Sequence, residues 1–422
     1  MISGFNFIQN NRFTGFISLV FALFIVLFPR FTELSKPFYV LLILTGTFYL
    51  LVNLKQLKET RLSERLFFIV ILLNFGWIAF SFYINKDPTS SDSFLWGRQV
   101  FFVFLIPLFL MLRYANISEK TIVLSIFASV LLTLGDISID LANDIEHRYQ
   151  GMNPNGFGPI QLSLCGVLLF SAIWGSDKRI RALALVGAVL AMITVILSYS
   201  RGTWLAIPFL TVFLIFYLVK SYSIGVKIVS VMVILLILSS SYALPVVKFK
   251  IDKSFTNITG YLASDDYRDE IRGESSGTRL ELWRAAWQMF LDKPVTGIGI
   301  GGIQKMNRDN WKEYEVHQSV QNYIYVHNQY IATMATRGIP GLILFLLLLA
   351  LPIYIAVSQQ SSDNQSKQAR LSIIFITITF AIGNLVEDHY ETKPAIMFIT
   401  VFIPVLLAKL QFQKNNSETE YG

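Results

Sequence analysis

The sequence has few charged residues, only four histidines and a single cysteine. Charged residues make up 15% of its 422 residues and hydrophobic residues 54%, whereas soluble domains contain roughly 25% charged residues. This deficit, together with a mean hydropathy of +0.54, excludes an ordinary soluble domain and indicates a polytopic membrane protein. The lone Cys165 lies inside an apolar run, which excludes a disulfide framework and a cysteine metal site.

Long apolar runs are abundant. A membrane-spanning helix needs about 20 mostly apolar residues, and about twelve runs approach or exceed the lower limit of roughly 17. The expected fold class is therefore an all-α polytopic membrane protein. The first run begins near Phe13 and is expected to be a retained transmembrane helix. The expected spans are 13–29, 37–53, 66–84, 98–113, 119–139, 156–174, 182–199, 203–219, 226–246, 340–358, 370–386 and 395–410.

The spans divide the chain into four parts. Residues 1–246 are expected to hold helices 1–9, and residues 340–410 to hold helices 10–12. Between them, residues 247–339 form one large loop, which is too long to lack structure of its own. Residues 411–422 form a tail.

The large loop is predicted to contain an amphipathic helix at residues 278–291, because its apolar side chains recur with helical spacing. That helix is expected to end at the sequence Asp292-Lys-Pro294, and the glycines of Gly297–Gly302 then turn the chain. The apolar face is expected to lie against the membrane surface or the helix bundle. It comprises Leu280, Trp283, Trp287, Phe290 and Leu291.

Lysine and arginine are unevenly shared between alternate loops. The loops at 55–65, 176–181 and 359–370 are rich in them, and the positive-inside rule places these loops and the tail in the cytoplasm. The 247–339 loop then lies outside, which in a bacterium is the periplasmic face of the inner membrane. The net charge of +7 is assigned to the cytoplasmic loops, and no nucleic-acid partner is expected.

Three arginines are candidates for binding an anion. Arg201 follows one apolar run and precedes another, where an arginine costs about 2.5–3.5 kcal/mol on insertion scales; the alternative is a snorkelling or topology-determining residue. Arg279 lies near the start of the loop helix, where free backbone N–H groups favour an anion; the alternative is a solvated surface position. Arg148 is a further candidate for the same site.

His327 is the candidate general base, because an unperturbed histidine pKa of roughly 6.5 suits proton transfer near neutral pH. The alternative is a structural histidine. The neighbouring Tyr323, Tyr325 and Tyr330 can pack in the core or bind a sugar ring. His389 follows Glu387 and Asp388, but adjacent residues seldom converge on one metal ion. A supporting or acceptor-binding role is favoured for it, and no metal site is expected.

Several of these residues form patterns that resemble the O-antigen ligase family. The resemblance in layout covers nearly the whole chain, while the specific motifs cover a small part of it. Arg201 and Leu205 match an R-x-x-x-L pattern, and the stretch that ends at Arg279 resembles the family's loop arginine. Asn153-Pro-Asn155 is also similar to that family. The pattern H-[NSQ]-x9-G-x-x-G/T/Y is matched in full by His327, Asn328, Gly338 and Gly341.

The resemblance implies a metal-independent glycosyltransferase that needs no cofactor. It implies transfer of a preassembled glycan from undecaprenyl diphosphate to a sugar hydroxyl of lipid A-core, within membrane lipids, on the periplasmic face. Carried over, Arg201 and Arg279 bind the diphosphate and His327 takes the proton. Inversion at the anomeric carbon is expected, since no residue presents itself as a covalent nucleophile. Supporting roles are assigned to Arg148, Asn328, Gly338, Gly341 and His389.

Three other functions remain open on the sequence. An O-antigen polymerase uses the same donor in a similar bundle, although the complete histidine motif favours a ligase. A protein O-oligosaccharyltransferase of related fold tends to carry a further C-terminal domain. A transporter of the lipid-linked glycan belongs to a different class, and typically buries ionisable residues in mid-span.

Overall fold

The computed structural model describes residues 11–85, 97–143, 152–198, 200–218, 224–225, 228, 245–263, 275–310, 312–314, 320–359 and 363–419. All regular structure in these ranges is helical, which confirms the expected all-α class. The first half of the chain contains α1 (Asn11–Leu27), α2 (Thr32–Val52), α3 (Leu62–Ile84), α5 (Leu105–Ala115), α6 (Glu119–Ala142), α7 (Pro154–Trp174), α8 (Lys178–Leu197) and α9 (Arg201–Leu218). The second half contains α11 (Pro245–Ala263), α13 (Ser275–Asp292), α14 (Gly302–Asp309), α15 (Gln329–Ser358), α16 (Asn364–Gly383) and α17 (Lys393–Thr419). Short 3-10 turns occur at Leu54–Glu59, Val100–Phe104 and His389–Glu391.

Within the described residues, eight helices are long and apolar enough to cross a membrane. The expected runs 13–29 and 203–219 form the shorter apolar helices α1 and α9. The run 370–386 falls mainly in α16, which is not among the eight and begins with the polar stretch Asn-Gln-Ser-Lys-Gln. The run 226–246 lies almost wholly outside the described residues. The total of about twelve spans therefore stays a prediction.

Two helix ends differ from the expected boundaries. The span expected from residue 340 belongs to α15, which already begins at Gln329 and is broken at Gly338, where φ is 65° and ψ is −167°. The end of the expected loop is therefore helical. At the other end of the chain, α17 continues to Thr419, so the tail expected from residue 411 starts as part of a helix.

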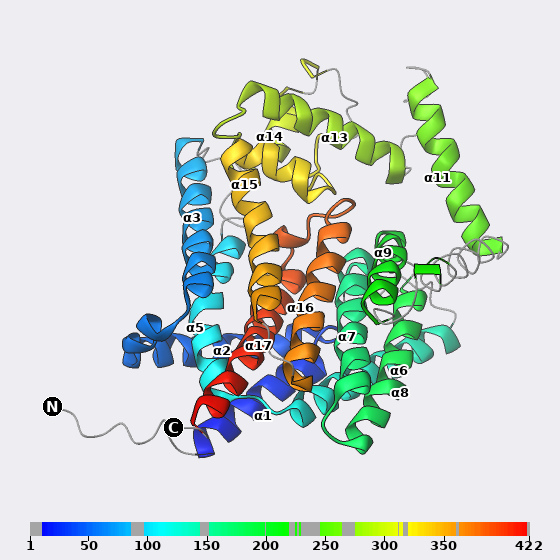
Figure 1. Ribbon diagram of the computed structural model, residues 1–422. Helices are drawn as coiled ribbons and strands as arrows, with labels where there is room; N and C mark the ends of the chain where they lie inside the picture. Colours follow the sequence, from blue (N-terminus) through cyan, green and yellow to red (C-terminus); the bar gives the residue numbers. More distant parts are fainter. Residues whose placement is uncertain are drawn as a thin grey trace.

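The helices are arranged around a buried centre (Figure 1). In the most apolar part of α17, 89% of the residues are buried, and in α7 the share is 83%. The corresponding share is only 33% for α2 and for α8, whose exposed side chains include large leucines and valines. Helices that are apolar on all sides are buried in a protein core or face lipid. Accordingly, α7 and α17 form the core, and α2 and α8 present apolar surface to the bilayer.

Above one end of the bundle, α13 lies across the start of α15 (Figure 1). The predicted loop helix is thus present, and it ends at Asp292 as expected. Its buried face was predicted only in part, because Trp287 is 46% exposed and Leu291 52% exposed. The small Ala285 and Ala286 are buried instead, since small side chains let α13 approach α15 closely.

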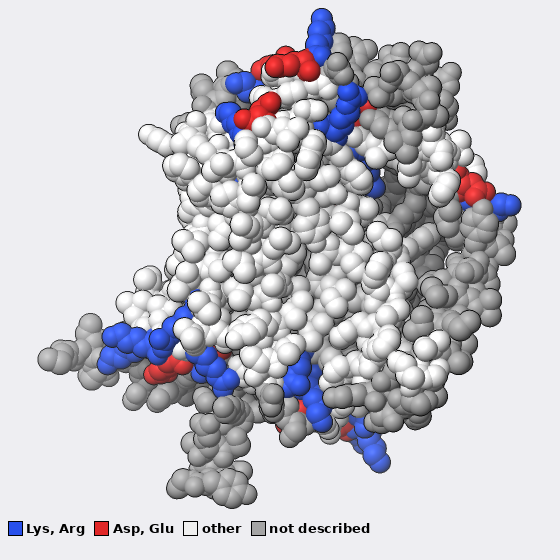
Figure 2. Space-filling model, turned by 45° about the horizontal axis from the view of Figure 1, so that its top comes forward, with Lys and Arg blue, Asp and Glu red and all other residues white. Residues whose placement is uncertain are grey.

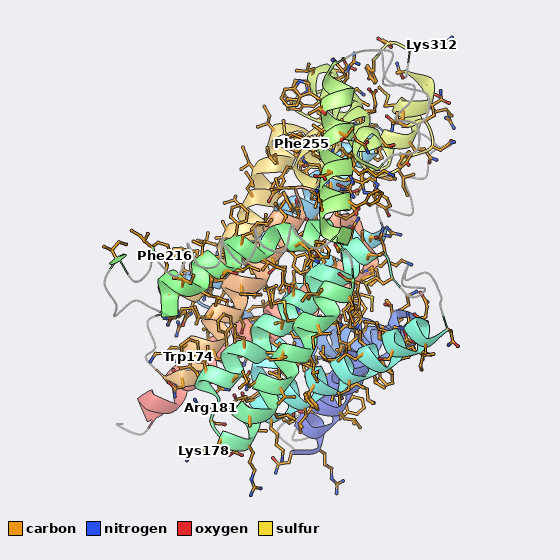
Figure 3. All side chains as sticks on the ribbon, turned by 90° about the vertical axis from the view of Figure 1, so that its right-hand side faces the viewer. Trp174, Lys178, Arg181, Phe216, Phe255 and Lys312 are labelled. Carbon is orange, nitrogen blue, oxygen red and sulfur yellow. The ribbon has the colours of Figure 1, made fainter. Side chains whose placement is uncertain are left out.

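Charged side chains mark the two ends of the bundle. Figure 2 shows lysine, arginine and acidic residues at the top and bottom of one face, with a broad uncharged band between them. Figure 3 places Lys178 and Arg181 at the end opposite Lys312. This separation is the arrangement expected of a bundle that crosses a membrane.

Candidate functional site

His327 lies on the short segment that leads into α15, at the end of the bundle covered by α13 (Figure 1). Its φ is 56°, a left-handed value that residues other than glycine rarely adopt. The backbone N–H groups of Val326 and His327 donate to the same carboxylate oxygen, Oδ2 of Asp388, at 2.7 and 3.0 Å. Asp388 thereby holds the segment in its unfavourable conformation.

The imidazole of His327 is paired with a carboxylate. Its Nδ1 lies 2.8 Å from Oε1 of Glu387, and the side chains are 21% and 5% exposed. The second oxygen of Glu387 accepts from Nδ2 of Asn155 at 2.9 Å, and Oδ1 of Asn155 accepts from the Ser200 hydroxyl at 3.3 Å. The site therefore joins the starts of α7, α9 and α15 to the loop that follows α16.

The electrostatics favour a charged Glu387 beside a basic imidazole. Burial lowers the pKa of His327, but the hydrogen bond and charge of Glu387 and the charge of Asp388 raise it above its usual value. Burial raises the pKa of Glu387, yet its bond to His327 and the nearby positive charge bring that pKa down to about 2. Burial and the charges of Glu391 and Glu387 raise the pKa of Asp388 to about 7.

This geometry sets the role of each ring nitrogen. An ionised carboxylate only accepts hydrogen bonds, so Nδ1 of His327 carries a proton and donates it to Glu387. In the neutral ring Nε2 is then the acceptor. A base held in one tautomer by a buried carboxylate is the arrangement that proton abstraction from a hydroxyl requires.

The other members of the histidine motif have structural roles. Asn328 caps α15, because its side-chain oxygen accepts from the backbone N–H groups of Tyr330 and Ile331 at 3.1 and 3.2 Å. Gly338 forms the break in that helix. At Gly341 a Cβ would lie 2.2 Å from Cβ of Arg337, so glycine leaves room for the arginine side chain.

The break at Gly338 leaves backbone carbonyls of α15 without partners in the same helix, and they accept hydrogen bonds from other segments. The carbonyls of Ala335 and Thr336 accept from the backbone N–H groups of Ile298 and Gly299 at 2.9 and 3.0 Å. The carbonyl of Arg337 accepts from the Trp77 indole at 2.7 Å. The glycine turn that follows α13 is thus bonded directly to the helix that begins beside His327.

We expect Gly338→Ala to destabilise the protein by about 3 kcal/mol or more, because strain and overpacking both act there. The new Cβ would lie 2.1 Å from the carbonyl oxygen of Val295, at a φ of +65°. Thermal unfolding of the purified protein in detergent measures the loss. Gly76→Ala in α3 is the matched control, because no atom lies within 4 Å of its Cβ position. Equal melting temperatures for the two variants would contradict the assigned role.

A buried polar cluster supports the loop after α16. Arg337 and Glu391 form an ion pair at 3.0 Å, with side chains only 2% and 4% exposed. The amide oxygen of Gln329 accepts from the backbone N–H of Tyr390 at 2.9 Å. The carbonyl of Glu391 accepts from Arg98 at 2.7 Å. These contacts fix the segment that presents Glu387 and Asp388.

The structure describes the three predicted arginines to different extents. Arg279, in the first turns of α13, is close enough to His327 for its charge to act on the pKa of the histidine. The backbone of Arg201 begins α9, directly after Ser200 of the site, but the Arg201 side chain lies outside the described residues. Arg148 also lies outside them.

His389 is placed behind the site. Its side chain is buried, and its ring lies edge-on to Phe380 with centroids 5.4 Å apart. Burial lowers its pKa to about 4, so the ring is neutral at pH 7. This placement favours a supporting role over direct contact with an acceptor.

The sequence did not identify Glu387, Asp388 or Asn155 as parts of the site. Glu387 and His327 are separated by 60 residues, and no periodic pattern connects them. The sequence contains one indication of their role. Glu387 and Asp388 lie in a short segment between apolar runs, and acidic side chains that become buried there need partners. In the sequence alone, these residues next to His389 suggest a metal site, which adjacent residues seldom form.

The fold and the site together define a polytopic membrane protein with a histidine–carboxylate pair at one end of its bundle. Residues 186–346 match the family model described as O-antigen ligase. The matched segment includes Arg201, Arg279, His327 and Gly338, and the predicted resemblance is confirmed there. An uncharacterized protein of Haemophilus influenzae is 24% identical over 369 residues, which cover 85% of this chain and 88% of that protein. The similarity to it therefore extends well beyond the matched segment.

Proposed function

We propose that the protein is a glycosyltransferase that moves a preassembled glycan from undecaprenyl diphosphate to a sugar hydroxyl of lipid A-core. The observation that carries the proposal is the 2.8 Å pair that Glu387 forms with His327, since His327 lies inside the segment that matches the O-antigen ligase family model. The proposed location is the bacterial inner membrane, with the site on the periplasmic face. The apolar helices hold the lipid chains of donor and acceptor in one plane, which favours their encounter.

In the proposed reaction His327 is the general base. As the acceptor hydroxyl oxygen attacks the anomeric carbon, Nε2 takes its proton and the bond from that carbon to the diphosphate oxygen breaks. The electron pair leaves with undecaprenyl diphosphate, and the configuration at the anomeric carbon inverts. Glu387 stabilises the imidazolium that forms, since it keeps its negative charge throughout.

Negative charge develops on the leaving diphosphate. We assign its stabilisation to Arg279 and Arg201, because guanidinium groups make charge-assisted and often bidentate hydrogen bonds to phosphate. Both lie in the first turns of helices, α13 and α9, where backbone dipoles also favour an anion. The outer segments lack an Asp-x-Asp motif, and the proposed mechanism uses no metal ion.

The experiment is transfer in a purified system. The protein in detergent is mixed with undecaprenyl-diphosphate glycan and lipid A-core, with EDTA present. We expect glycan on lipid A-core and an equal amount of released undecaprenyl diphosphate. Longer lipid-linked chains alone would mean a polymerase, and glycan on an added protein would mean a protein O-oligosaccharyltransferase. If no product forms, the protein is reconstituted into vesicles, and movement of the donor across their bilayer would mean a transporter. Activity that EDTA removes and Mg²⁺ restores would overturn the metal-independent mechanism.

A further inference from the structure

Three tyrosines surround His327 in the sequence, and the structure separates their roles. The Tyr325 hydroxyl accepts a hydrogen bond from Arg98. The Tyr330 hydroxyl donates to the carbonyl of Ala381 at 2.7 Å, and its ring packs against Phe345 with centroids 5.6 Å apart. Both side chains are therefore held by the helix bundle, and neither hydroxyl is available to a ligand without breaking these contacts.

Tyr323 is different. It is 38% exposed, and within the part of the chain that the structure describes its hydroxyl has no hydrogen-bond partner. Its ring centroid lies 6.3 Å from that of His327, with 72° between the ring planes. The backbone is nevertheless fixed, because its N–H donates to the carbonyl of Val320 at 3.0 Å and its carbonyl accepts from Asn307 at 3.4 Å. An apolar ring is thus held at the surface beside the candidate base.

We propose that Tyr323 binds the sugar ring of the acceptor, the ring whose hydroxyl is deprotonated by His327. This inference rests on the proposed function. A pyranose ring has apolar C–H faces, and packing one of them on an aromatic ring removes apolar surface from water. The exposed tyrosine hydroxyl offers a donor and an acceptor for the polar rim of the same sugar.

Direct contact between the base and the acceptor hydroxyl favours the acceptor as the ligand of Tyr323. A general base has to come within about 2.6–3.2 Å of the oxygen from which it takes a proton. A sugar with its hydroxyl at His327 therefore lies next to the ring of Tyr323. The donor, in contrast, is bound through its diphosphate by arginines in the proposed mechanism. Tyr323 is consequently a specificity-determining residue for the acceptor.

The test is a kinetic comparison of Tyr323→Ala with the wild type, with lipid A-core and undecaprenyl-diphosphate glycan varied separately. We expect the KM for lipid A-core to rise about tenfold, which equals about 1.4 kcal/mol. The KM for the donor and the kcat at saturating acceptor are expected to change less than about threefold, a shift below 0.7 kcal/mol on the same scale. Tyr323→Phe retains the ring and is expected to recover most of the affinity.

Matched controls are Tyr325→Phe and Tyr330→Phe, which remove the bonds to Arg98 and Ala381. We expect them to lower the melting temperature without raising the KM for lipid A-core. An unchanged acceptor KM in Tyr323→Ala, or a rise in the donor KM alone, would overturn the inference while leaving the transferase intact. A fall in kcat alone would instead assign Tyr323 to positioning His327. Absence of transfer by the wild-type protein would refute the proposed function itself.

Discussion

Replacing His327 with asparagine should lower glycan transfer at neutral pH by about 10²–10⁴-fold, the usual contribution of a general base. Asparagine suits this position, because it tolerates the left-handed φ of 56° better than most residues. The fold should therefore survive, and the backbone bonds to Asp388 should persist. Initial rates of transfer to lipid A-core, at saturating donor and acceptor, measure the effect.

The pH profile shows whether the loss reflects proton transfer. In the wild type only neutral His327 accepts a proton, so activity falls as pH decreases through its pKa. That pKa is raised, and the acid limb should lie above pH 6.5. The His327→Asn variant should lose this limb, because Asp388, whose pKa is about 7, accepts hydrogen bonds from the backbone and has no role as a base in the proposed reaction. A variant that retains more than about a tenth of the activity would exclude a general-base role for His327.

The sequence predicted much of the scaffold because membrane helices leave strong local signals. Apolar runs located α2, α3, α6, α7 and α8 to within a few residues. The start of α15 was missed because its first turns contain Gln329, Thr333 and Thr336, which are polar but buried. Thr333 and Thr336 form hydrogen bonds within α15, whereas Gln329 accepts from the backbone N–H of Tyr390 in another segment. Such long-range pairing leaves no trace in hydropathy.

Some residues of the candidate site could likewise be predicted from the sequence, and others could not. His327 was predicted from a motif, and Asn328 and Gly338 belong to the same motif. The motif gave no indication that Asn328 caps a helix or that Gly338 breaks it, because both roles depend on where the helix begins. Glu387 was not predicted because its pairing with His327 is tertiary. The buried face of α13 was predicted only in part for a related reason, since its contacts with the rest of the protein bury Ala285 and Ala286 and leave Trp287 exposed.

Replacing Glu387 with glutamine should lower the rate of glycan transfer nearly as much as replacing His327 does, by about 10²–10⁴-fold. Both carboxylate oxygens accept, one from His327 and the other from Asn155. A glutamine has only one acceptor oxygen, so its NH₂ group must face one of these two donors. If it faces His327, Nδ1 has to become the acceptor and Nε2 then carries the proton. That tautomer cannot take a proton from the acceptor hydroxyl through Nε2.

The remaining activity of Glu387→Gln should have a shifted pH profile. Without the carboxylate charge, burial and the positive charge of Arg279 lower the pKa of His327. The acid limb, which lies above pH 6.5 in the wild type, should therefore move to lower pH while the plateau falls. Rates of transfer to lipid A-core measured across a pH series would record both changes.

Glu391→Gln provides the matched comparison four residues along the same loop. Glu391 pairs with the buried Arg337, and breaking a buried ion pair costs about 3–5 kcal/mol of stability. Its substitution should lower the melting temperature without moving the acid limb to lower pH, because losing the charge of Glu391 lowers the pKa of Asp388 and the charge of Asp388 raises that of His327. If Glu387→Gln instead behaved in this way, with lower stability and an unmoved limb, Glu387 would be a structural residue and His327 would act without a carboxylate partner. If only Glu387→Gln moves the acid limb to lower pH, the proton chemistry belongs to the His327–Glu387 pair. The comparison is matched because both substitutions alter the same loop, but one removes the partner of His327 and the other the partner of Arg337.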